Sequence, residues 1–158
     1  MVVPDALAPS RATGGMNVPG FRPLAVAVLA RLPAIALADS HRTSAPEGAS
    51  VYFIAPQDGA TVASPVTVTF GLSGMGVAPA GVEKEMTGHH HLLIDQELED
   101  YDNAMPSDDN HRHFGGGQTE TTVELAPGTH RLQLILGDHN HIPHQPPVQS
   151  QVITITVE

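Results

Sequence analysis

Nine of the ten histidines in this chain lie between residues 89 and 144, and all of these except His130 fall into three short groups. Each group contains a His-x-His pair: His89 with His91, His111 with His113, and His139 with His141. On a β-strand, residues i and i+2 point to the same face, so each pair can present two imidazoles side by side. Two such pairs would complete a four-coordinate site for a transition metal.

The candidate metal ligands are the histidines of the three groups: His89, His90, His91, His111, His113, His139, His141 and His144. We expect five of them to converge on one ion, namely His89, His91, His113, His139 and His141. On a regular strand His90 would point away from its two neighbours. His130 is left out because it has no partner at i+2.

Four carboxylates beside the histidine groups are candidate hydrogen-bond partners of the metal-bound rings: Asp95, Asp108, Asp109 and Asp138. A metal-bound histidine usually donates its other ring N–H to such a group, which fixes the orientation of the ring. Any of these carboxylates could instead bind the metal directly.

The chain has no cysteine, which excludes thiolate metal sites and disulfide bonds. Calcium and magnesium prefer shells of oxygen ligands, whereas imidazole suits copper, zinc, nickel and iron. The expected cofactor is therefore a transition metal ion, copper first and zinc next. Met75, Met86 and Met105 are possible thioether ligands for cuprous copper, although single methionines more often fill gaps in a core.

The charge balance excludes one large class of partner. Seventeen acidic residues against seven basic ones give a formal net charge of -10. A protein that binds the phosphate backbone of nucleic acid needs the opposite balance. An acidic surface concentrates small cations instead, so the expected partner is the metal ion, and the sequence names no protein partner.

Short alternating runs bounded by Gly and Pro replace helical periodicity from Ala49 onward. The expected strands are 51–54, 65–72, 89–95, 119–125, 130–136 and 149–157. This pattern predicts an all-β fold, an immunoglobulin-like β-sandwich of about six or seven short antiparallel strands with long His-rich loops. A jelly roll is the closest alternative, and the acidic stretch 95–109 is expected to be a long surface loop.

The N-terminal part differs in composition and is expected to be removed. Residues 1–15 have no periodic pattern and are expected to be disordered or an over-called start. Residues 16–38 contain a mainly apolar run that ends in Ala36-Leu37-Ala38, which is typical of a cleaved signal peptide. Residues 39–49 are expected to be a linker and residues 50–158 the His-rich domain. The protein is thus expected in the periplasm or secreted, with no stable membrane span after processing.

The motifs together resemble an uncharacterised bacterial family, the domain of unknown function 4399. The resemblance is carried by residues Phe70–Val82, Gly88–Asp95, Asp108–Glu120 and Gly137–His144, and it covers roughly residues 50 to 157. It implies an exported, histidine-rich domain without an agreed activity.

Three functions remain open at this stage. The first is an exported metal-binding protein that sequesters, buffers or delivers copper or zinc. The second is a copper-dependent redox metalloenzyme, in which three histidines hold the ion and an open position meets substrate. The third is a structural or adhesive sandwich domain with incidental histidines. The sequence does not decide whether the protein is an enzyme.

Overall fold

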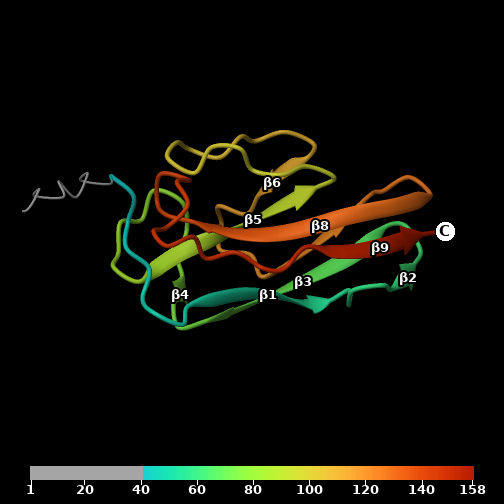
Figure 1. Cartoon of the computed structure of the whole chain (residues 1–158), viewed down its shortest axis with the longest axis horizontal. Helices are drawn as coiled ribbons and strands as arrows, with labels where there is room; N and C mark the ends of the chain where they lie inside the picture. The colour runs from blue at the N-terminus through green and yellow to red at the C-terminus, as the bar shows by residue number, and fades with distance from the viewer. Residues whose placement is uncertain (1–40) are drawn as a thin grey trace, which may run out of the picture. The chain divides into compact units, whose positions relative to one another are not determined.

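The computed structural model describes residues 41–158, which form a two-sheet β-sandwich (Figure 1). Its strands are β1 (Ser50–Ala55), β2 (Thr61–Val62), β3 (Val66–Ser73), β4 (Gly76–Val77), β5 (Thr87–Ile94), β6 (His111–His113), β7 (Glu120–Val123), β8 (Gly128–Gly137) and β9 (Ile153–Val157). Residues 41–158 contain no helix, and hence none that could cross a membrane. The predicted all-β fold class is confirmed.

The strand order is that of an immunoglobulin sandwich. One sheet has the order β1-β3-β7, and the other has the order β2-β9-β8-β5-β4, with β6 paired to β5. In immunoglobulin folds, strands A, B and E lie in one sheet and strands C, F and G in the other. Strands β1, β3 and β7 take the first three positions, and β5, β8 and β9 take the other three.

Strand β5 is buried on both of its faces. Leu92 and Ile94 point into the main core between the sheets. Leu93 points to the opposite, outer face of the sheet, where it packs with Ile135 and with Met105 from the long segment between β5 and β6. The outer face of this sheet is therefore covered by chain, and side chains that alternate along β5 are shielded from solvent in both directions.

The six longer strands lie where the alternating pattern predicts them. The three short ones, β2, β4 and β6, have only two or three residues each, which is too short for a pattern to be recognised. The expected signal peptide at 16–38 and the start at 1–15 lie outside the described residues. Residues 43–45 of the expected linker run beside the segment after β8, because Ala45 donates to the Gln145 carbonyl and Gln145 donates to that of Thr43.

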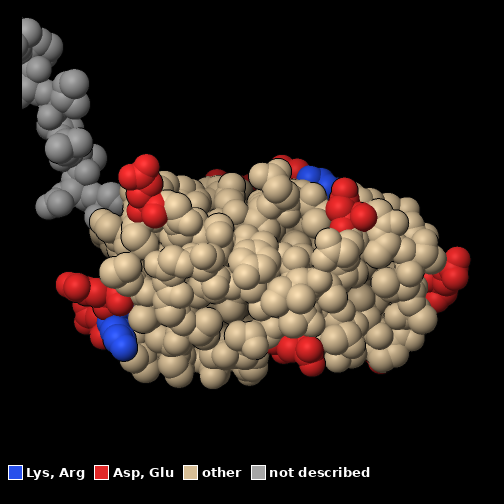
Figure 2. All heavy atoms as spheres, turned by 90° about the horizontal axis from the view of Figure 1, so that it is seen from below, with Lys and Arg blue, Asp and Glu red and all other residues tan. Residues whose placement is uncertain are grey.

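The surface on the side of β1 and β3 carries few charges. Figure 2 shows this face, where the acidic side chains lie mostly toward the edges. Tyr52 and Ile54 of β1 are about half exposed there, at 46% and 52%. The histidine groups belong to the other sheet and its connections.

Candidate metal centre

Four histidines from three parts of the chain converge on the outer face of the larger sheet. Two come from β5, one from β6 and one from the turn after β8: His89, His91, His113 and His141. They are called the four-histidine cluster below. Each can offer one ring nitrogen such that the four nitrogens lie within 4.8 Å of one another. The centroids of the four rings are 4.3–5.7 Å apart.

Strand geometry places three of the four rings. His89 and His91 are two residues apart on β5 and so share a face, as the His-x-His pattern predicts. In the antiparallel pairing of β5 with β6, His91 lies directly opposite His113. Opposite residues in such a pair have Cβ atoms about 5 Å apart, which allows two imidazoles to meet.

A tight turn after β8 places the fourth ring. The buried Asp138 carboxylate accepts hydrogen bonds from the backbone N–H groups of Asn140 and Ile142, at 2.8 and 3.0 Å. The N–H of His141 donates to the Asp138 carbonyl. His141 itself has a φ of 67°, in the left-handed region that few non-glycine residues adopt. Asp138 therefore acts on the cluster by shaping the turn that carries His141.

The nitrogen positions are compatible with a metal ion. His89 Nε2 lies 3.0 Å from His91 Nε2 and 3.0 Å from His141 Nδ1. For metal–nitrogen bonds of about 2.0–2.1 Å, neighbouring ligands are about 3.3 Å apart in a tetrahedral site and about 2.9 Å apart in a square-planar one. His89 Nε2 carries either one proton or one lone pair, so it can form one regular hydrogen bond, as donor or as acceptor, and its other contact is left without one.

Burial disfavours the protonated form of three of the four cluster histidines. His89 and His91 have 0% and 1% of their surface exposed. The pKa of His89 is lowered to about 4, mainly by burial and then by the neighbouring His141 and His113, against a smaller opposing effect of the Asp138 charge. The pKa of His91 is lowered to about 2, again mainly by burial. Burial and His141 also lower the pKa of His113.

Glycines provide the space that the rings occupy. A Cβ on Gly137 would lie 2.8 Å from His91 Nε2, and a Cβ on Gly115 would lie 2.4 Å from His113 Nε2. Real Cβ atoms essentially never approach a nitrogen this closely, so any side chain at these positions would displace a ring. Gly115 belongs to the glycine run beside the second histidine group. Apart from its position directly before the third histidine group, nothing in the sequence around Gly137 indicated that a ring packs against it.

His111 and its neighbouring carboxylates lie outside the cluster. The His111 ring pairs with the Asp108 carboxylate at 2.9 Å, and Asp109 pairs with Arg112 at 3.4 Å. In the pairing of β5 with β6, the residue opposite His111 is Leu93, not a histidine. The pair His111 and His113 is thus divided, with only the second member in the cluster.

His130 was expected to stand apart, and the structure places it with Asp95. Asp95 Oδ2 lies 2.7 Å from His130 Nδ1, and Asp95 Oδ1 accepts from the backbone N–H of Arg131. The Ala126 carbonyl and this carboxylate raise the pKa of His130. Asp95, like Asp108 and Asp109, is therefore engaged with groups other than the four cluster histidines.

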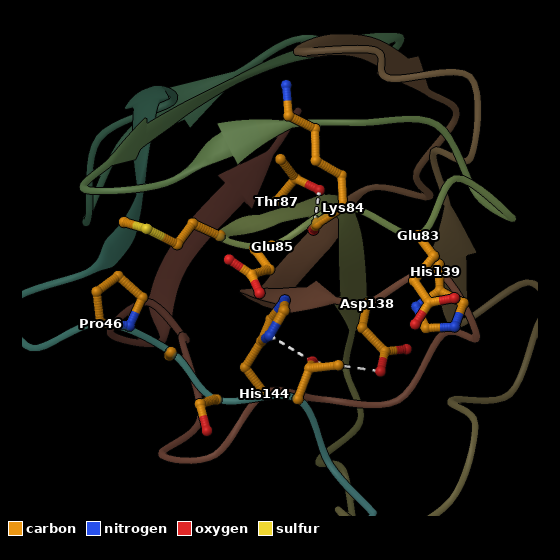
Figure 3. A pocket seen from close by; sticks show the side chains of 12 residues that line it. Pro46, Glu83, Lys84, Glu85, Thr87, Asp138, His139 and His144 are labelled. Atoms are coloured by element: carbon orange, nitrogen blue, oxygen red, sulfur yellow. Dashed lines mark hydrogen bonds between the residues drawn. The ribbon is translucent and has the colours of Figure 1, made fainter.

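His139 and His144 line a separate pocket of about 460 Å³, and none of the four cluster histidines lines it (Figure 3). His144 Nδ1 lies 2.7 Å from the hydroxyl of Thr43, which also donates to Asp138 at 3.3 Å. His139 Nε2 lies 2.8 Å from the side-chain amide of Asn140. The structure therefore does not bring these two candidate ligands to the cluster.

His90 points to the opposite side of β5, into the main core. Its ring lies 5.2 Å from that of Phe70, and neither of its nitrogens makes a hydrogen bond of regular geometry. Burial lowers the pKa of His90, against a smaller raising effect of the Gln118 backbone. The structure places His90 outside the four-histidine cluster, in a position where an imidazole is costly to bury.

We expect the substitution His90→Leu to stabilise the metal-free protein by about 1 kcal/mol, because it removes two buried polar atoms that lack hydrogen bonds of regular geometry and keeps a similar volume. Chemical denaturation of the two proteins measures this difference. Metal affinity should stay unchanged. A loss of affinity in this variant would place His90 among the ligands after all.

A family model described as Domain of unknown function (DUF4399) matches residues 68–158. The matched region begins within β3, runs through β9 and contains all four cluster histidines. This match confirms the resemblance that the histidine-rich motifs suggest. No curated protein and no solved structure matches the chain significantly.

Proposed function

Because this chain belongs to the DUF4399 family, whose description assigns no activity, we propose a function from the site itself: an exported protein that binds one transition metal ion through the four-histidine cluster. Copper is the first candidate and zinc the second. The role that fits such a site is sequestration, buffering or delivery of the ion in the periplasm or outside the cell.

One observation carries this proposal. Four imidazole nitrogens from β5, β6 and the turn after β8 can lie within 4.8 Å of one another, and the two most buried rings are held neutral. Only neutral imidazole binds metal, and an all-nitrogen set without thiolate suits copper and zinc. The expected signal peptide supports export of the protein.

Calorimetric titration of the full chain with copper and with zinc tests the proposal. We expect saturable binding of one ion per chain. Elemental analysis of protein purified from its native compartment identifies the metal that is bound there. If neither ion binds in a saturable way, the structural or adhesive alternative is what remains.

A second candidate function is a redox metalloenzyme, and one observation favours it. His113 belongs to the cluster and also lines a groove of about 500 Å³ beside Arg112, Thr121 and Thr122. A substrate in this groove would lie near the ion. Consumption of oxygen, peroxide or superoxide by the metal-loaded protein, but not by the metal-free protein, would favour the enzyme over the binding protein.

A further inference from the structure

A buried methionine lies against the four-histidine cluster. Met105, on the segment between β5 and β6, is 6% exposed and packs with Leu93 and Ile135 on the outer face of the sheet. Its backbone N–H donates to the carbonyl of His141 at 2.9 Å. The segment that carries Met105 is thus tied directly to the turn that carries a cluster histidine.

The terminal methyl group of the Met105 thioether borders the same space as a nitrogen of the four-histidine cluster. Met105 Cε lies 2.9 Å from the position that a Cβ on Gly137 would take, and His91 Nε2 lies 2.8 Å from that same position. The sulfur is bonded directly to Cε. Because Gly137 has no side chain, nothing from that residue separates the thioether from the His91 ring.

The other two methionines that the sequence offered as thioether ligands are placed differently. Met86 is 55% exposed and lines the pocket of His139 and His144. Met75 packs against the main core between the sheets. Within residues 41–158, Met105 is therefore the methionine placed to act on the cluster.

We propose that Met105 supplies its thioether as one ligand of a cuprous ion at the four-histidine cluster, completing a shell of at most four with imidazoles of the cluster, and that it sets the preference of the site for this ion over zinc. The inference rests on the proposed metal-binding function and deepens it. Thioether sulfur is a soft ligand that selects Cu(I), whereas zinc takes nitrogen, oxygen and thiolate. A methionine that served only as apolar filling would be replaceable by leucine without a change in metal preference.

X-ray absorption on the full chain tests the ligand directly. The protein is produced with selenomethionine and loaded without oxygen with one equivalent of Cu(I). We expect a copper atom at bonding distance in the selenium-edge spectrum, and we expect that signal to vanish in Met105→Leu but to persist in the matched control Met86→Leu. Copper that is bound with nitrogen neighbours alone would overturn the thioether ligand and leave the metal-binding function standing.

Competition titrations test the preference. Met105→Leu should weaken Cu(I) binding by more than about tenfold, because the loss of a direct ligand costs more than the loss of a neighbour to the site, and it should leave zinc binding unchanged. Equal losses for both ions would overturn the proposal and reduce Met105 to a packing role. If the unaltered protein binds neither ion, the proposed function fails and this inference fails with it.

Discussion

His141→Ala is expected to abolish tight metal binding, whereas His139→Ala, two residues away in the same turn, leaves it intact. The nitrogen of His141 lies 3.0 Å from His89 Nε2 in the centre of the cluster, but the His139 ring is paired with the amide of Asn140. Loss of one of four ligands costs more than loss of a neighbour to the site, so we expect affinity to fall by more than about a hundredfold.

The two variants form a matched pair, because both histidines lie in the turn shaped by Asp138. Calorimetry with copper and zinc measures the affinities, and circular dichroism checks that both variants keep the β-sandwich. The sequence predicts that both histidines converge on the ion, so this pair also decides between that prediction and the placement in the structure. Equal losses in the two variants would contradict the cluster as described.

Acidification is expected to destabilise the metal-free protein over a wide pH range. Histidine in an unfolded chain titrates near pH 6.5, whereas the pKa of His89 in the folded protein is about 4 and that of His91 about 2. Between pH 6.5 and 4 the unfolded state takes up a proton that His89 does not accept in the folded state, so folding loses free energy as the pH falls. At about 1.4 kcal/mol per pKa unit, His89 alone accounts for about 3 kcal/mol.

Because the pKa of His91 is lower than that of His89, the loss of folding free energy that His91 causes continues to lower pH. Above pH 6.5 both rings are neutral in both states, so they contribute no slope there. Urea unfolding at several pH values measures the dependence, and His89→Leu should flatten it between pH 6.5 and 4. His130 acts in the opposite direction, because its raised pKa favours the folded state in acid, and it is present in both proteins. An unchanged slope in His89→Leu would contradict the lowered pKa.

Sequence patterns within one strand predicted the features that depend on that strand alone. The His-x-His spacing places His89 and His91 on one face and His90 on the other, because side chains alternate with period two. The same alternation predicts the six longer strands and the sandwich. In each case the neighbours in sequence are enough to fix the result.

The rest of the cluster depends on contacts between distant parts of the chain. Whether His111 or His113 joins the cluster is decided by the register of β6 against β5, which sets His113 opposite His91. Whether His139 or His141 joins it is decided by the turn around Asp138 and the left-handed backbone of His141. The spacing of the histidines does not predict the register of two strands or the geometry of a turn.

The packing of the acidic segment 95–109 over the outer face of the larger sheet is a further feature that its composition does not predict. The acidic segment after β5 was expected to be a long surface loop. Most of it is polar, but Leu98 and Met105 anchor it on the outer face of the sheet beside the cluster. Two apolar residues within a charged stretch give little periodic signal, although they decide where the segment lies.

The uneven burial of the cluster determines how an ion would be handed over. His89 and His91 are enclosed between the sheet and its cover, while the rings of His113 and His141 are partly exposed. If the protein delivers the ion as proposed, a receiving protein would reach it from the side of His113 and His141. It would then substitute its own ligands for His113 and His141 before the two enclosed imidazoles.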